Sequence, residues 1–172
     1  MKKATITMKK LVEVSSNMHP AFKEFADSLQ PSFERLMASV PFTASTIPRG
    51  CAKQGIYLFS EGDLHLYVGR TRQFIQRMAQ HSRPGSQHNQ AVFAFRLARE
   101  GTGRIEASYG GEWTRVRLCL DEEFSNAFTA SKARVRNMHL RFLEESNPLR
   151  QALLEIYVSV ALKTPYNDFN TH

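Results

Sequence analysis

The chain has 172 residues, of which 42% are hydrophobic and 12 are phenylalanine, so it can bury the core of one folded domain and is not a disordered chain. The 23 lysines and arginines exceed the 16 aspartates and glutamates and give a net charge of +7, which favours a polyanionic partner such as nucleic acid. No apolar run reaches the roughly 18 residues of a membrane span and no secretion signal is recognisable, so we expect a cytoplasmic protein without membrane contact.

The N-terminal part of the chain is predicted to be helical. From His19 to Val40 the apolar residues recur every three or four positions, which is the spacing of an amphipathic helix. Pro31 lies inside this run and has no backbone N–H, so we expect two short helices or one kinked helix. We assign residues 1–48 to a helical arm and residues 49–172 to the main domain.

A β-hairpin is predicted to open the main domain. The runs Gly55–Phe59 and Leu64–Val68 are rich in strand-forming residues, and the polar segment Ser60–Asp63 separates them. Because side chains alternate along a strand, Tyr57 and Tyr67 are expected on the same face of the sheet. Tyrosine favours strands in general, so the pair alone also fits an ordinary structural hairpin.

A helix from Arg72 to about His81 is predicted to follow, with Thr71 as its cap. Gly69 would let a ligand approach the backbone, and the free N–H groups at the helix N-terminus would attract a phosphate. Three polar residues recur every four positions and would form one stripe on this helix, away from its apolar side: Gln73, Arg77 and His81. Such a stripe suits phosphate binding, although a solvated polar face gives the same pattern.

The remaining elements follow from periodicity and from capping residues. Residues 82–133 are predicted to form a mainly helical insertion, and the last helix should begin with Asn147 as cap and Pro148 at its first position. The predicted segments are a loop at 82–89, a helix at 90–99, a strand at 114–120, a helix at 121–133, a strand at 135–143 and a helix at 148–162.

Glu155 is the one charged residue between Ala152 and Leu162 of the last helix. A helix that is apolar on all sides is expected to be buried, and a buried carboxylate without a partner is costly. We therefore expect Glu155 to face a cation, a hydrogen-bond network or an opening to solvent. A divalent metal ion would satisfy it, and so would a structural ion pair. Cys51 and Cys119 lack the spacing of zinc ligands and are expected to be reduced thiols.

The order of these residues resembles that of the GIY-YIG endonucleases. Gly55-Ile56-Tyr57 corresponds to the first motif of that family, and Tyr67-Val68-Gly69 corresponds to the second motif. Arg77 and His81 stand where the family carries an arginine, and often a histidine, on its first helix.

The end of the chain continues the resemblance. The family closes its core with a metal-binding glutamate on a helix and an asparagine just past that helix, and Glu155 and Asn167 match this arrangement. The match covers about residues 52–81 and 135–167, with the insertion between them. It implies an α+β fold in which helices flank a small mixed or antiparallel three-stranded sheet.

The resemblance also implies a function, which is metal-dependent hydrolysis of phosphodiester bonds, with DNA favoured over RNA. One Mg²⁺ or Mn²⁺ ion would be held by Glu155. The implied roles of the other residues are activation of water by Tyr57, proton acceptance by His81, phosphate binding by Arg77 and positioning by Tyr67 and Asn167. Candidate phosphate contacts elsewhere are Gly69, Arg70 and His88.

Two other functions fit the same sequence. The chain could be a nucleic-acid-binding module that keeps the fold but does not cleave, or a basic helical interaction protein in which the tyrosine hairpin is structural. All six family positions are filled, which favours an active enzyme. The sequence leaves open the substrate specificity, the biological pathway and the oligomeric state.

Overall fold

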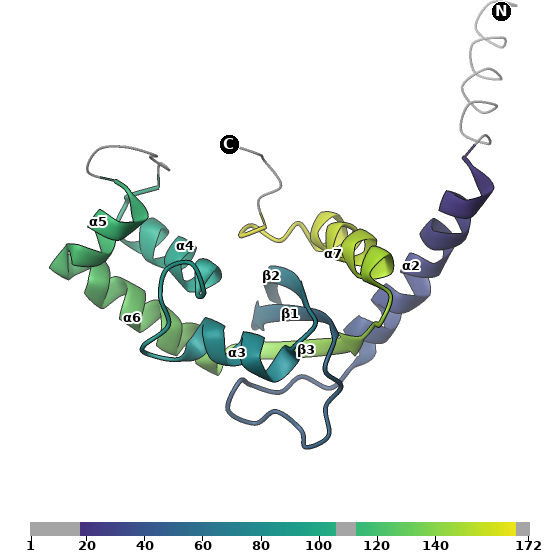
Figure 1. The fold of residues 1–172 in the computed structure, drawn as a ribbon, viewed down its shortest axis with the longest axis horizontal. Helices are drawn as coiled ribbons and strands as arrows, with labels where there is room; N and C mark the ends of the chain where they lie inside the picture. Colours follow the sequence, from purple (N-terminus) through teal and green to yellow (C-terminus); the bar gives the residue numbers. More distant parts are fainter. Residues whose placement is uncertain (1–17, 106–112, 168–172) are drawn as a thin grey trace, which may run out of the picture.

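The computed structural model describes residues 18–105 and 113–167. These residues form an α+β fold with one three-stranded sheet and six helices (Figure 1). The strands are β1 (Gly55–Glu61), β2 (Leu64–Thr71) and β3 (His139–Glu144), and both β2 and β3 pair with β1 in antiparallel orientation. The sheet is therefore antiparallel throughout, with β1 at its centre.

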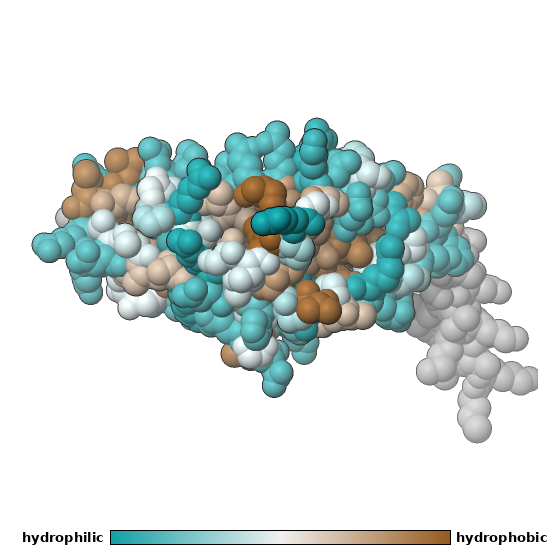
Figure 2. Space-filling view, turned by 90° about the horizontal axis from the view of Figure 1, so that it is seen from below, coloured by the Kyte–Doolittle hydropathy of each residue, from teal (hydrophilic) through white to brown (hydrophobic). Residues whose placement is uncertain are grey.

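Helices lie at both ends of the sheet. In Figure 1, α4, α5 and α6 gather at one end of the molecule, while α2 and α7 lie at the other end. The bounds of the helices are α2 (Pro20–Ala38), α3 (Phe74–Ser82), α4 (Val92–Gly101), α5 (Arg115–Leu120), α6 (Glu122–Asn137) and α7 (Pro148–Leu162). None of the helices in the described ranges has the length and apolarity needed to cross a membrane. Hydrophilic side chains cover much of the face seen in Figure 2, with apolar side chains grouped between them.

Helix α2 runs through Pro31 without a break into two helices. Of the two predicted forms, two short helices or one kinked helix, the structure excludes the first, since the hydrogen bond that Pro31 cannot donate does not end the helix. The helix packs against α7, where Phe33 lies edge-to-face on Tyr157 with 5.7 Å between the ring centroids. Leu36 of the same helix is fully buried.

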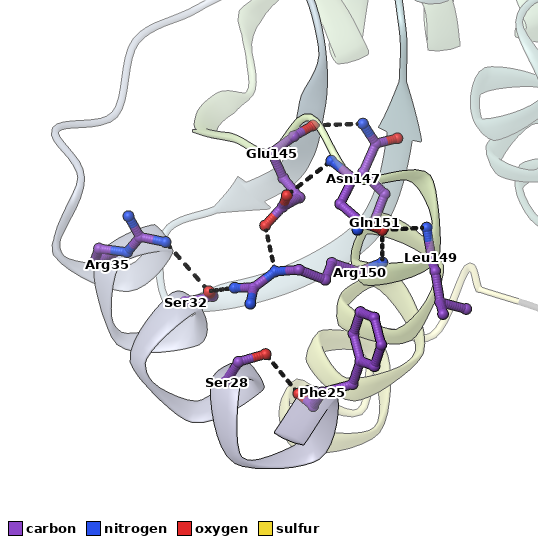
Figure 3. Close-up of polar contacts among 9 residues, drawn as sticks. All are labelled: Phe25, Ser28, Ser32, Arg35, Glu145, Asn147, Leu149, Arg150 and Gln151. Atoms are coloured by element: carbon purple, nitrogen blue, oxygen red, sulfur yellow. Dashed lines mark hydrogen bonds and ion pairs between the residues drawn. The ribbon is translucent and has the colours of Figure 1, made fainter. Parts of the chain in front are cut away.

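A polar network ties α2 to the start of α7 (Figure 3). The Arg150 guanidinium donates from Nε to Glu145 at 2.8 Å and from Nη2 to the Ser32 hydroxyl at 3.3 Å. Asn147 caps α7, since its side-chain oxygen accepts from the backbone N–H groups of Leu149 and Arg150. The predicted cap is thus confirmed.

Two predicted elements differ from the structure. Residues 114–120 were expected to form a strand, but Thr114 accepts a hydrogen bond from the Arg117 N–H and begins helix α5. Helix α6 also extends to Asn137, so that only the second half of the predicted strand 135–143 belongs to β3. The reason is that Val135 continues the helical series of buried residues on α6 and does not belong to a strand pattern.

The two faces of the sheet support separate cores. On one face Tyr57 and Phe59 pack with residues of α3, α4 and α6. On the other face Ile56 and Leu58 pack with residues of α2 and α7. The alternation of side chains along β1 produces this division, as expected for a strand that is covered on both sides.

The segment between α2 and β1 covers the outer edge of β3. Phe42 in this segment exchanges two backbone hydrogen bonds with Leu140, with lengths of 3.0 and 2.7 Å.

At the hairpin between β1 and β2, Gly62 has a φ of +55°, which supports the predicted turn. Cys51 and Cys119 are both free thiols.

Gly69 on β2 lies directly under the side chain of Tyr57. A Cβ atom at position 69 would stand 2.4 Å from the Tyr57 hydroxyl oxygen and 2.5 Å from the ring carbon that carries it. Gly55 has a similar constraint, because a Cβ atom there would lie 2.0 Å from the carbonyl oxygen of Leu143. Glycine is required at positions 55 and 69 because neighbouring groups occupy the space that a side chain would need.

The Gly69→Ala variant should therefore displace Tyr57 and lower the free energy of unfolding by about 1–3 kcal/mol, as overpacking does in other cores. Gly101→Ala is the matched control, because nothing lies within 4 Å of the Cβ atom built at that position in α4. Urea denaturation of the two variants and the wild type measures the difference. Equal stability of the two variants would contradict the steric role of Gly69.

Candidate active site

The hydroxyl of Tyr57 is the centre of a hydrogen-bonded cluster. It lies 2.9 Å from Nε2 of His81 and accepts a hydrogen bond of 3.2 Å from Nε of Arg77. Tyr57 comes from β1, whereas both partners come from α3, and the side chain of Tyr57 is 1% exposed. The phenol group of Tyr57 thus links β1 to α3 through hydrogen bonds.

Tyr67 joins this cluster from β2, on the same face of the sheet as predicted. Its ring centroid lies 6.3 Å from that of Tyr57 and 5.9 Å from that of His81. Phe93 of α4 stacks on Tyr67 with 4.9 Å between the centroids and 11° between the ring planes. Phe93 could not be predicted as a member of this cluster, because its residue type and its position in the insertion match no motif.

His81 is fully buried, which corrects the predicted polar stripe on this helix. Phe74, Met78 and His81 face the core at helical spacing, whereas Ile75, which was expected on the apolar side, is 57% exposed. Gln73 does not belong to the helical stripe either, since it is the N-cap residue. The helix places its histidine inside because only an interior position lets it reach Tyr57.

Burial keeps the two partners Tyr57 and His81 neutral. It raises the pKa of Tyr57 far above its usual value, with a further increase from Tyr67 and a decrease from Arg77. It lowers the pKa of His81 well below 6.5, and the charge of Arg77 adds to this decrease. The phenol therefore holds its proton, and a neutral imidazole stands beside it as acceptor. Nδ1 of His81 has no hydrogen-bond partner in the described part of the chain.

Glu155 lies at the margin of the cluster, on α7. Its Oε2 accepts a hydrogen bond of 3.0 Å from Nε of Arg70, and the side chains of Glu155 and Arg70 are 20% and 49% exposed. Burial raises the pKa of Glu155, while Arg70 and Arg77 counteract this effect. The expectation that Glu155 faces a cation is confirmed, and in this structure the cation is Arg70.

Helix α7 is covered on one side only, which corrects the expectation that it is buried all round. Ile156 is 47% exposed and Val160 is 69% exposed, whereas Leu154 and Val158 are buried against the sheet. The composition of the helix misled the prediction because a small domain does not have enough elements to cover both sides of it.

Glu155 offers a single carboxylate at this margin, and that carboxylate is engaged with Arg70. No group of three or more histidine, cysteine, aspartate or glutamate residues within residues 18–105 and 113–167 could hold a metal ion. Mg²⁺ is satisfied with one or two carboxylates because it keeps several water molecules and also binds substrate phosphate. Arg70, being half exposed, could turn outward and leave the Glu155 oxygen to such an ion.

Asn167 binds the outer edge of β2. Its Oδ1 accepts from the N–H of Val68 at 2.8 Å, and its Nδ2 donates to the carbonyl of Val68, also at 2.8 Å. The hydroxyl of Thr164 lies 2.8 Å from the same Oδ1. Asn167 therefore fixes the strand between Tyr67 and Gly69. Among the described residues, its side chain bonds to the backbone of β2 and to Thr164 and not to Glu155.

The three candidate phosphate contacts have different positions. Gly69 is buried beneath Tyr57, so the group that approaches its backbone is a tyrosine side chain. Arg70 pairs with Glu155, and His88 lies near Phe95 of the insertion, with 6.1 Å between the ring centroids. The first amide of α3, that of Phe74, donates to the Lys53 carbonyl at 2.7 Å and is not free for a phosphate.

Helix α3 also begins later than predicted. Thr71 does not cap it, since its hydroxyl accepts from the N–H of Gln73 and the helix starts at Phe74. Within this helix, Nη1 of Arg77 donates to the Gln80 side chain at 3.2 Å and to the Gln90 carbonyl at 3.0 Å. These two glutamines fix the guanidinium and carry no recognisable signal in the sequence.

Comparison of the chain with known protein families, with curated proteins and with solved structures found no match. The functional argument therefore depends on the order of the motif residues and on the contacts described above. Those contacts join Tyr57, Tyr67, Arg77 and His81 into one cluster, with Glu155 close enough to influence the pKa of both tyrosines.

The low pKa of His81 predicts how stability depends on pH. A depressed pKa in the folded state means that the stabilisation is complete above the unfolded value of about 6.5 and decreases as the pH falls through it, by up to about 1.4 kcal/mol per pH unit for one proton. Wild type should therefore lose stability below this pH more steeply than His81→Gln. Urea denaturation across a pH series measures both curves, and parallel curves would refute a buried neutral His81.

Proposed function

We propose that this chain is a divalent-metal-dependent endonuclease of the GIY-YIG type, which hydrolyses phosphodiester bonds with DNA as its preferred substrate. The observation that carries the proposal is the hydrogen-bonded cluster of Tyr57, His81 and Arg77. The order of these residues in the sequence and the position of Glu155 next to two arginines support the same function.

Arg77 would bind the scissile phosphate. A guanidinium has five N–H groups in a planar fork, and those not engaged with Tyr57, Tyr67, Gln80 and Gln90 remain available for phosphate oxygens. Its positive charge would offset the negative charge that builds up on the phosphate during attack. As Arg77 turns to the phosphate, it would uncover the Tyr57 hydroxyl, which is otherwise buried.

Tyr57 and His81 would take up the proton of the attacking water. The water oxygen forms a bond to phosphorus, and the bond from phosphorus to the leaving oxygen breaks. The water proton passes to the phenol oxygen of Tyr57, while the phenol proton passes to Nε2 of His81, which lies 2.9 Å from that oxygen. This relay does not require free phenolate, which the raised pKa of Tyr57 disfavours. The leaving oxygen is protonated by solvent.

A bound Mg²⁺ or Mn²⁺ would supply stabilisation of charge on the phosphate and on the leaving oxygen. Glu155 is the residue that would hold it, in exchange for the ion pair with Arg70. Tyr67 and Asn167 would act through position, the first by packing beside Tyr57 and the second by fixing β2. Inactive nucleic-acid binding on the same fold is the competing function, and cleavage assays separate the two.

Purified wild-type protein should nick supercoiled plasmid DNA when Mg²⁺ or Mn²⁺ is present and not when it is chelated. Glu155→Ala should lower the rate about 100-fold or more, and Arg77→Ala should lower it on the order of 100- to 1000-fold, since each removes stabilisation of the transition state. Gel electrophoresis of the plasmid forms measures these rates.

Glu24→Ala, which removes an exposed carboxylate from α2, is the matched control and should cleave at the wild-type rate. Circular dichroism must first show that each variant is folded. Full activity in a folded Glu155→Ala protein would refute the metal assignment, and metal-independent binding without cleavage by the wild type would favour the inactive module.

A further inference from the structure

A groove of about 1170 Å³ runs along the exposed side of α3. It lies between this helix, the segment that precedes β1 and the loop that follows α3. Tyr57, Tyr67 and Glu155 do not line it. Gln80 and Gln90 do, and both of them also contact the guanidinium of Arg77. Arg77 is not among the lining residues, so the groove lies beside the candidate active site and meets it through Gln80 and Gln90.

The charged residues of this groove are all basic. Lys53, Arg72 and Arg83 line it, and its lining holds no aspartate or glutamate. Some cations elsewhere in the chain have carboxylate partners, as Arg104 has in Asp121. Within residues 18–105 and 113–167, no carboxylate forms an ion pair with Lys53, Arg72 or Arg83. Unpaired cations that follow one groove create a field that attracts a polyanion.

One side of α3 supplies neutral polar groups to the same groove. Gln76 and Gln80 are four residues apart on α3 and lie on one face of the helix. Gln73 and Arg83 line the same groove from the N-cap and C-cap positions of the helix. The opposite face packs into the core. An amide side chain can both donate and accept hydrogen bonds, which suits sugar hydroxyls and the edges of bases. Ile75, which is 57% exposed, adds an apolar surface at the rim.

We propose that this groove binds the nucleic-acid strand that continues from the phosphate held by Arg77. Lys53, Arg72 and Arg83 pair with flanking phosphates, and the glutamines face sugars and base edges. This inference rests on the proposed function for the identity of the polyanion. A nucleic acid is favoured over an acidic protein because the groove lies beside a phosphate-binding arginine and combines cations with amide groups.

The first test measures binding of a fluorescent DNA duplex by anisotropy, in chelator and over a series of salt concentrations. The variant Arg72→Gln/Arg83→Gln should bind at least about 10-fold more weakly than wild type, and the slope of log affinity against log salt should fall by about two units. The control Lys23→Gln/Arg35→Gln removes the same charge from exposed positions on α2 and should keep the slope. Equal slopes for both variants would overturn the proposal.

The second test uses the wild-type chain, so that folding of a variant plays no part. Cys51 lines the groove and Cys119 does not. Duplex DNA should slow alkylation of Cys51 by N-ethylmaleimide several-fold and leave Cys119 unchanged, as read by mass spectrometry of the peptides. Unchanged alkylation of Cys51 would overturn the proposal. Equal protection by polyglutamate would overturn the assignment of the groove to nucleic acid.

The two proposals fail in different ways. If the wild type nicks plasmid but DNA does not protect Cys51, the groove assignment is wrong and the nuclease assignment stands. If DNA protects Cys51 and binding depends on Arg72 and Arg83, while no cleavage occurs under any metal condition, the nuclease assignment is wrong and the groove assignment stands.

Discussion

The site depends on the absence of a side chain at Gly69. Because β2 has only a hydrogen atom there, the Tyr57 ring can lie across the strand and extend its hydroxyl toward α3. His81 and Arg77 meet the phenol at that point. A larger residue at position 69 would displace the Tyr57 ring, so the two motif segments of the hairpin depend on each other for their packing. The spacing between the two motifs, which pairs Tyr57 with Gly69, therefore meets a steric requirement as well as a chemical one.

The cluster has a buried interior and a partly exposed margin that contains an ion pair. Tyr57 and His81 form a hydrogen bond in a buried space where charge is strongly disfavoured, so burial raises the pKa of Tyr57 and lowers the pKa of His81. Glu155 and Arg70 lie at the margin, where solvent can reach an ion pair and an incoming cation can compete for the carboxylate. Arg77 connects both regions and also contacts two residues that line the groove along α3.

Local patterns predicted the elements that depend on local chemistry. Strand alternation placed Tyr57 and Tyr67 on one face, and side-chain capping placed Asn147 at the start of α7. The predictions failed where a distant element decides. His81 is buried because α3 must supply a partner for a phenol from β1, and residues 114–120 form a helix because no strand is available beside them. Periodicity within a segment contains no information on such partners.

A sheet of three strands has two outer edges, and each presents backbone groups that could pair with a strand from another molecule. Here Phe42 closes the edge of β3 through two backbone hydrogen bonds. Asn167 closes the edge of β2 at Val68, where its amide imitates a peptide group by donating once and accepting once. The asparagine that holds the site in register therefore also works against the growth of this sheet into an aggregate, and selection on either property would retain it.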